Sequence, residues 1–338
     1  MGMKKFLIKL FLILLPFLIA LTIYVIDDPF MVIRSHTRYD DSHIALNENM
    51  VGWEMYKAEK DSIHFNSFLM GNSCTQAFKC RKWEEYLGKD DRAFRWIDNN
   101  ETLEGLCIKL KALEKEHAEL KNVLIILDWD SFNKVELRNG AIHSMPRDIS
   151  GISEFTYQSK YVQLFIYPSF FIPYMRHKFN KNYTHVGVVN NFDRTRDSIT
   201  NDAINPYDKI IEEEGEKYWN QRQTEFPSRH YRMMDPTIYP DAITKLDTLR
   251  SIFKRNNTDL ALVIGPDYWL KQINPKDVAI LKRYLGNDNV YDFTGYNNYS
   301  AEKHNYYEKG HYRPIVGDDI LKRIYSKKTL DLNKKALP

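Results

Sequence analysis

The chain has 338 residues, and its 48 lysines and arginines nearly balance its 45 aspartates and glutamates, which leaves a net charge of +3. This balance gives no sign of a basic nucleic-acid surface, and we expect no nucleic-acid partner. Three cysteines allow at most one disulfide, which excludes a disulfide-built scaffold.

The N-terminus predicts a membrane anchor. Lys4 and Lys5 precede an almost wholly apolar run over residues 6–26, which is long enough for a helix to cross about 30 Å of hydrocarbon. Basic residues before the run favour a cytoplasmic N-terminus. A cleaved signal peptide is the alternative, but the apolar run is long for one and no small-residue cleavage motif follows. We expect residues 1–28 to anchor the chain in the cytoplasmic membrane, with the rest outside the cytoplasm.

The residues after the anchor predict an α/β fold. We expect residues 29–60 to form a stalk and the entry to the domain, with a short helix at about 48–57, and residues 61–338 to form the domain. Strand and helix patterns alternate over residues 63–70, 75–87, 93–97, 103–120 and 123–127. This alternation is typical of a parallel sheet with right-handed crossovers, and continuous apolar strands are buried on both faces. We therefore expect a three-layer α/β sandwich with a mostly parallel sheet.

The alternation lapses between about residues 138 and 240, which we expect to be an insertion that forms a cap or faces substrate. Its aromatic segment over residues 161–174 is too short and too interrupted by proline to be a second membrane span. Regular patterns then return, with a helix over 241–255, a strand over 260–264, a helix after Pro275, a strand over 290–293 and a last helix over 316–325.

The first candidate for chemistry is Ser73, which follows Gly71 and Asn72 directly after the first predicted strand. Ligands bind at the carboxyl edge of the sheet in open α/β folds. The glycine allows a sharp turn, and a helix N-terminus would offer free N–H groups to an oxyanion. A helix cap is the alternative role, because Ser73 and Gln76 also fit a capping box. Cys74 is a rival nucleophile, although it would point away from the edge if Ser73 points toward it.

The second candidate is His311, which Glu308 precedes by three residues. A carboxylate at this spacing can orient the imidazole while the other ring nitrogen acts as a base. A polar, tyrosine-rich surface loop is the alternative. His304 could join both residues in a zinc site if the segment were helical, but Gly310 and the lack of a fourth ligand argue against it. We expect no metal and no cofactor.

Together, and in this order, the two motifs resemble the SGNH (GDSL-like) hydrolase superfamily. Phe68-Leu-Met-Gly-Asn-Ser-Cys-Thr75 is similar to the Leu-Gly-x-Ser-x-Thr opening of its membrane-anchored envelope branch. Tyr307-Glu-Lys-Gly-His-Tyr312 is similar to that branch's closing Asp-x-x-His-Tyr. The branch includes the D-alanyl transfer protein of teichoic acids and the acetylation proteins of alginate. The resemblance covers most of residues 65–325, except the central hundred.

This resemblance implies that Ser73 is the nucleophile, His311 the general base and Glu308 its orienting acid, with an acyl-serine intermediate. The implied function is transfer of an acyl group, most simply acetyl, to an extracytoplasmic polysaccharide or other glycan. A polytopic membrane protein would supply the acyl group. A carbohydrate esterase with the same residues and a catalytically silent envelope scaffold are the alternatives.

The sequence departs from the superfamily pattern where the oxyanion hole is usually built. Asn99 and Asn100 stand where a glycine is usual, and Asp130 stands where an asparagine is usual. An ionised aspartate would repel an oxyanion, so the hole must use other donors. The candidates for oxyanion or substrate contacts are Asn72, Asn99, Asn100 and Asp130, beside the Ser73 amide, with Trp129 as a further possible substrate contact.

Overall fold

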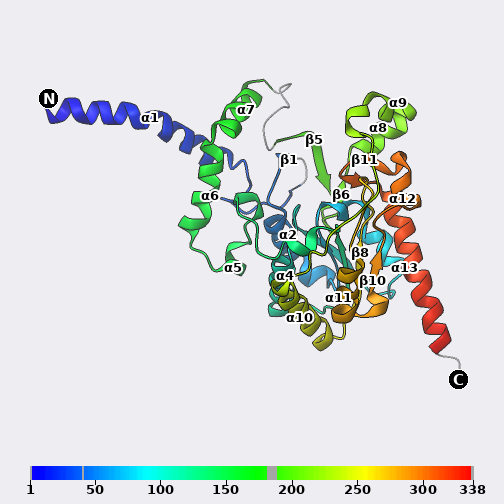
Figure 1. Ribbon diagram of the computed structural model, residues 1–338. Helices are drawn as coiled ribbons and strands as arrows, with labels where there is room; N and C mark the ends of the chain where they lie inside the picture. Colours follow the sequence, from blue (N-terminus) through cyan, green and yellow to red (C-terminus); the bar gives the residue numbers. More distant parts are fainter. Residues whose placement is uncertain (1, 40–41, 181–188, 336–338) are drawn as a thin grey trace.

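The computed structural model describes residues 2–39, 42–180 and 189–335 (Figure 1). At its centre is a five-stranded sheet in the order β10-β8-β4-β2-β3, and all of its pairings are parallel. The strands are β2 (Ser67–Gly71), β3 (Ala93–Ile97), β4 (Asn122–Leu127), β8 (Asp259–Ile264) and β10 (Val290–Asp292). The predicted α/β fold with a mostly parallel sheet is therefore confirmed.

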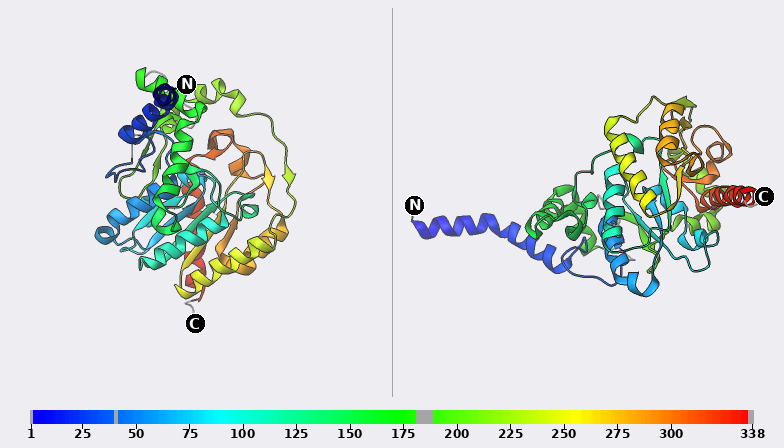
Figure 2. Two further views of the ribbon diagram at one scale, coloured as in Figure 1. Left: turned by 90° about the vertical axis from the view of Figure 1, so that its left-hand side faces the viewer. Right: turned by 90° about the horizontal axis from the view of Figure 1, so that it is seen from below.

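Helices cover both faces of the sheet (Figures 1 and 2). Those on one face are α2 (Glu48–Ile63), α4 (Leu103–Lys115), α10 (Pro240–Arg255) and α11 (Pro275–Leu285). Those on the other face are α3 (Cys80–Glu84) and α13 (Pro314–Lys335). Neighbouring residues of a strand point to opposite faces, so Phe68 belongs to the first cluster and Leu69 to the second. Because both faces are buried, most residues of the strands are apolar.

The strand order creates a switch point beside β2. The chain passes from β2 to β3 on one side of it and then returns to β4 on the other side. In open α/β sheets, ligands bind outside the carboxyl ends of the strands at such a point. Ser73, just after β2, and Asp128, just after β4, both lie there.

The N-terminal helix α1 (Met3–Asp27) extends away from the domain, and most of its apolar side chains are exposed (Figure 1). It is long and apolar enough to cross a membrane, and among the described residues it alone has this property. The helix therefore has the length and composition that we predicted for an anchor.

From Glu48 onward, the region predicted as stalk and domain entry packs on the domain. There α2 begins, and its Val51, Trp53 and Tyr56 are each at most 2% exposed within the main core. Because α2 packs on the sheet, it belongs to the domain. The sequence looked polar there because its outward-facing residues alternate with the buried ones along the helix.

The inserted region divides into two parts. One part contains α5 (Arg147–Ser150), α6 (Glu154–Ile166) and α7 (Pro168–Phe179), of which α6 and α7 pack near the end of α1. The other part contains β5 (Val189–Arg196), β6 (Ala203–Ile204), α8 (Tyr207–Glu214) and α9 (Glu216–Gln221). The remaining elements are β1 (Ser42–Ile44), β7 (Arg232–Met233), β9 (Lys271–Gln272), α12 (Asn298–Ala301), β11 (Tyr306–Glu308), β12 (His311–Tyr312) and several short 3₁₀ turns, among them η1 (Ser73–Ala77).

A buried ion pair stabilises the first face of the sheet. Lys109 of α4 and Glu101 are both almost completely buried and bond to each other, and burial raises the pKa of Glu101 to about 7. Removal of one partner leaves the other charge uncompensated, so we expect Lys109→Met to lower the free energy of unfolding by about 3–5 kcal/mol. Denaturant unfolding of the full chain in detergent micelles measures this. Lys111→Met, on the exposed side of the same helix, should change it by less than about 0.5 kcal/mol. Equal effects of the two substitutions would contradict the prediction.

Candidate functional site

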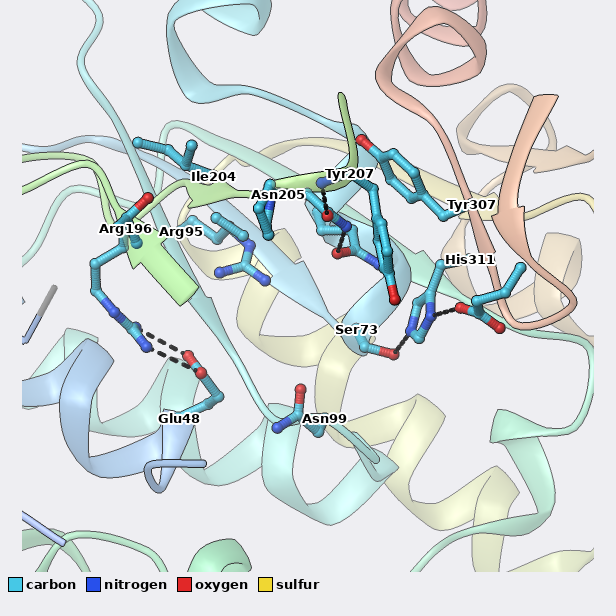
Figure 3. Close-up of a pocket in the computed structure, with 15 residues that line it drawn as sticks. Glu48, Ser73, Arg95, Asn99, Arg196, Ile204, Asn205, Tyr207, Tyr307 and His311 are labelled. Atoms are coloured by element: carbon cyan, nitrogen blue, oxygen red, sulfur yellow. Dashed lines mark hydrogen bonds and ion pairs between the residues drawn. The ribbon is translucent and has the colours of Figure 1, made fainter. Parts of the chain in front are cut away.

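Ser73 and His311 come from distant parts of the sequence and meet at the carboxyl edge of the sheet (Figure 3). The Ser73 Oγ and His311 Nε2 atoms are 2.8 Å apart. The other ring nitrogen, His311 Nδ1, bonds to the Glu308 carboxylate. The structure thus brings the three predicted residues into one chain of hydrogen bonds, in the order that a base-activated nucleophile requires.

The turn that carries Ser73 depends on Gly71. This last residue of β2 has φ +133°, a conformation that side chains rarely permit. Ser73 then begins the 3₁₀ turn η1, which is not the longer α-helix predicted for residues 75–87. The cap of this turn is Asn72, whose side-chain oxygen accepts a hydrogen bond from the Cys74 backbone amide at 2.9 Å. Because Asn72 fills this role, the hydroxyl of Ser73 is left to bond with His311.

Asn72 was predicted as a candidate donor to the oxyanion, but its side chain is used in the turn. Its Nδ2 atom donates to Asp128 Oδ2 at 2.7 Å, so both ends of its amide hold the turn in place. Asp128 also accepts a hydrogen bond from the Cys74 thiol at 3.3 Å. Burial raises the pKa of Asp128, and the bond from Cys74 opposes only part of the rise.

Cys74 points away from the cavity and into the core beneath the sheet edge, as its place next to Ser73 suggested. Burial and the nearby carboxylate of Asp128 raise the pKa of this thiol well above its usual value. A thiol held in its protonated form is a poor nucleophile. Cys74, Cys80 and Cys107 are all buried and free, so all three act as core residues.

Glu308 and His311 lie on the β11–β12 hairpin, which the insertion holds in place. Burial alone would raise the pKa of Glu308, but the bonds from His311 and from the Gly310 amide keep it below its usual value. The carboxylate therefore stays ionised beside the imidazole. From α9, Tyr218 Oη and Trp219 Nε1 donate to backbone carbonyls of β11 at 2.8 and 3.1 Å.

Ser73, His311 and Glu308 line a cavity of about 240 Å³. The insertion supplies the facing wall, with Thr195, Arg196, Ala203, Ile204, Asn205, Pro206 and Tyr207 (Figure 3). Pockets for drug-sized molecules begin at about 300 Å³, so this cavity admits a small group such as an acyl chain or part of one sugar. This part of the insertion is therefore a wall of the cavity.

Two arginines in the cavity wall were not predicted. Arg95 of β3 is 4% exposed, and its guanidinium donates to Thr75 Oγ1 at 3.1 Å and to the Asn201 carbonyl at 3.2 Å. Arg196 forms a two-pronged ion pair with Glu48, with both contacts at 3.1 Å. A charged residue inside the otherwise apolar strand β3 was the available signal, because a buried cation needs partners or a cavity.

Of the predicted oxyanion and substrate candidates, Asn99 lines the cavity (Figure 3). Asn100 is exposed outside it, and Asp130 pairs with Lys134 at 2.8 Å, also outside it. Trp129 also lies outside the cavity, and it packs against the ammonium of Lys271. Asn100 and Asp130 are therefore not placed as the oxyanion prediction required, and Trp129 has a packing contact, which was the alternative role for it.

The Ser73 amide donates to no acceptor in the ranges that the structure describes. It therefore remains available to an oxyanion. His304 lies apart from the cavity, since its Nε2 atom is 3.0 Å from Glu216 Oε1. Among the described residues, no group of three or more histidine, cysteine or acidic side chains is arranged to hold a metal ion.

No family model matches the sequence, and neither does any curated protein. The geometry of the site is therefore the basis for a functional proposal.

Proposed function

We propose that this protein transfers an acyl group, most simply acetyl, to an extracytoplasmic glycan through an acyl-serine on Ser73. The observation that carries the proposal is the 2.8 Å contact between Ser73 Oγ and His311 Nε2, with Glu308 bonded to the far side of the ring. A structural serine has no need of a histidine that a partly buried carboxylate orients. The position at the switch point of the sheet and beside a small cavity also supports a reactive centre.

The chemistry takes place in two balanced steps. Ser73 Oγ attacks the acyl carbon of the donor ester while His311 Nε2 accepts its proton, and that proton then passes to the departing alkoxide. The acyl-serine forms as the donor's ester bond breaks. An acceptor hydroxyl next loses its proton to His311 and attacks the acyl carbon. The bond between the acyl carbon and Ser73 Oγ breaks, and His311 Nε2 returns the proton to Ser73 Oγ. Throughout, the ionised Glu308 stabilises the imidazolium.

The strand order and the two motifs together support an SGNH-like fold for the domain. The helix α1 supports an anchored protein, and the basic residues before it favour a domain outside the cytoplasm. Acyl-CoA is not available there, so a polytopic membrane protein is the proposed source of the acyl group. A hydrolase would use the same residues with water in the second step. Adding a glycan acceptor distinguishes the two reactions, because only a transferase would move the acyl group to the glycan.

The direct test is the intact mass of the full chain after incubation with p-nitrophenyl acetate. We expect the wild type to gain one acetyl group, mapped to Ser73, and Ser73→Ala to gain none. Cys74→Ala is the matched control and should acylate like the wild type, because its thiol is buried and protonated. An adduct that persists in Ser73→Ala and maps to Cys74 would refute the serine mechanism. A folded wild type that forms no adduct would favour the silent scaffold.

The oxyanion hole provides a second prediction, for which Asn99 and Asn100 are a matched pair. Asn99 lines the cavity beside the unpaired Ser73 amide, whereas Asn100 is exposed outside it. Loss of one oxyanion donor typically costs about 10²–10³-fold in rate, so Asn99→Ala should slow acylation of Ser73 by that amount. Asn100→Ala should acylate at the wild-type rate. Equal rates for the two variants in a time course of adduct formation would exclude Asn99 from the hole.

A further inference from the structure

The helix α7 carries an apolar stripe of which Ile172 and Phe179 are exposed in the described chain, while Phe171 also packs against Phe165 of α6. Phe171, Ile172, Met175 and Phe179 fall within about 100° around the helix axis, at the 3.6-residue period. They line an open, largely apolar hollow, and Ile172 and Phe179 are 50% and 84% exposed. An exposed stripe of this kind on a surface helix marks an interaction site.

One flank of the stripe on α7 is fixed to the end of α1. Tyr174 donates its hydroxyl to the Asp27 carboxylate at 2.8 Å, and Lys178 pairs with the same carboxylate. On α6, Phe165 packs against Tyr24 of α1 with ring centroids 5.4 Å apart. Figures 1 and 2 show α6 and α7 lying across the end of α1. The position of α7 relative to α1 is therefore well defined.

Asp27 sets the depth of α7 relative to a membrane. The 25 residues of α1 span about 38 Å at about 1.5 Å per residue, while the hydrocarbon layer is about 30 Å thick. When α1 crosses the bilayer, its last residue, Asp27, lies just beyond the hydrocarbon. Because Tyr174 and Lys178 bond to Asp27, α7 lies at the boundary between lipid and water.

We propose that α7 is an interfacial helix that inserts its apolar stripe into the lipid surface from which α1 emerges. This inference rests on α1 acting as the membrane anchor in the proposed function. Lys178 and Arg176 flank the stripe on its two sides, which is the arrangement of helices that lie in the headgroup region. The stripe lies on a helix that packs at the end of the long apolar helix α1, which favours lipid over a soluble partner as its occupant.

A second membrane contact restricts the orientation of the domain relative to the membrane. A single helix leaves the domain free to rotate about it, whereas α1 and α7 together hold the domain in one orientation. The cavity at Ser73 is then presented at a constant height and angle to a donor in the membrane. An acyl group can pass between two proteins only if their sites meet repeatedly in the same geometry.

The experiment places an environment-sensitive fluorophore on the full chain in phosphatidylcholine–phosphatidylglycerol vesicles. The label is attached through Phe179→Cys, or through Tyr239→Cys as a control that is 64% exposed at the start of α10. The native cysteines are buried and should label poorly. We expect blue-shifted emission at position 179 and quenching by spin-labelled lipid several-fold stronger than at position 239.

Equal quenching at the two positions would overturn the proposal. So would a blue shift at position 179 without quenching by lipid, because this result would indicate contact with protein, such as a second copy of the chain. Acylation of Ser73 in the same vesicles is measured separately by mass. Failure of the membrane contact and failure of the proposed function therefore give different results.

Discussion

Replacement of His311 by alanine is expected to slow acylation of Ser73 by about 10²–10⁴-fold, the usual contribution of a positioned general base. Without the imidazole, the Ser73 hydroxyl has no acceptor for its proton as it attacks. The measurement is the rate at which the acetyl adduct appears on Ser73 in the intact protein. The fold should persist, because the His311 side chain is 30% exposed and its removal opens no closed core cavity.

The matched control for this prediction is His304→Ala. His304 lies seven residues earlier in the same segment, but it pairs with Glu216 and does not line the cavity. We expect its loss to leave the acylation rate within about twofold of the wild type, since surface changes away from the site have small effects. If both alanine variants acylate at the wild-type rate, His311 is not the base. If both lose activity together with their thermal transition, the loss reflects unfolding and the base is tested instead with the near-isosteric His311→Gln.

Replacement of Gly71 by alanine is expected to destabilise the protein by at least about 4 kcal/mol. A Cβ atom at this position would lie 1.9 Å from the carbonyl oxygen of Ile126 in the neighbouring strand β4. That oxygen also accepts a hydrogen bond from the Asn72 backbone amide, so the added methyl group would disrupt the hydrogen bond just before the turn that carries Ser73. The backbone at φ +133° adds strain of its own. Thermal or denaturant unfolding of the full chain in detergent micelles provides the measurement.

Gly151 separates the two causes of this effect. Its φ of +68° is also unfavourable for alanine, but a Cβ there meets nothing within 4 Å. We expect Gly151→Ala to cost only about 1–2 kcal/mol, the price of a left-handed backbone. A Gly71→Ala variant that is no less stable than Gly151→Ala would show that β2 and β4 can move apart at this edge.

Several features of the protein followed from short stretches of sequence. The unbroken apolar run over 123–127 and its alternation with helical patterns predicted a parallel sheet, because a strand buried on both faces needs apolar residues throughout. The candidate pair of Ser73 and His311 followed from position, since a serine after the first strand and a histidine near the last one reach the same sheet edge. The apolar run of α1 was equally plain, because a membrane-spanning length of apolar residues is itself the signal.

The errors fell where a side chain's direction depends on distant contacts. Asn72, Asn100 and Asp130 were all predicted as candidates for contact with an oxyanion. In the structure Asn72 bonds within the turn, Asn100 is exposed to solvent and Asp130 pairs with Lys134. Loop residues have no fixed side-chain period like that of a strand or helix, so nothing local indicates where they point. The ion pair between Glu48 and Arg196 could not be predicted for the same reason, because the two residues meet only when the insertion packs over the sheet.

The sequence by itself determined the long apolar helix at the N-terminus, the parallel sheet and the candidate serine, histidine and acid, because each depends on local periodicity or on spacing within one segment. Only the tertiary structure decided which residues surround them. The 2.8 Å contact between Ser73 and His311, the role of Asp128 beneath the turn and the wall that the insertion supplies all join residues far apart in the chain. Such contacts arise from the packing of whole elements, and no short pattern of residues encodes them.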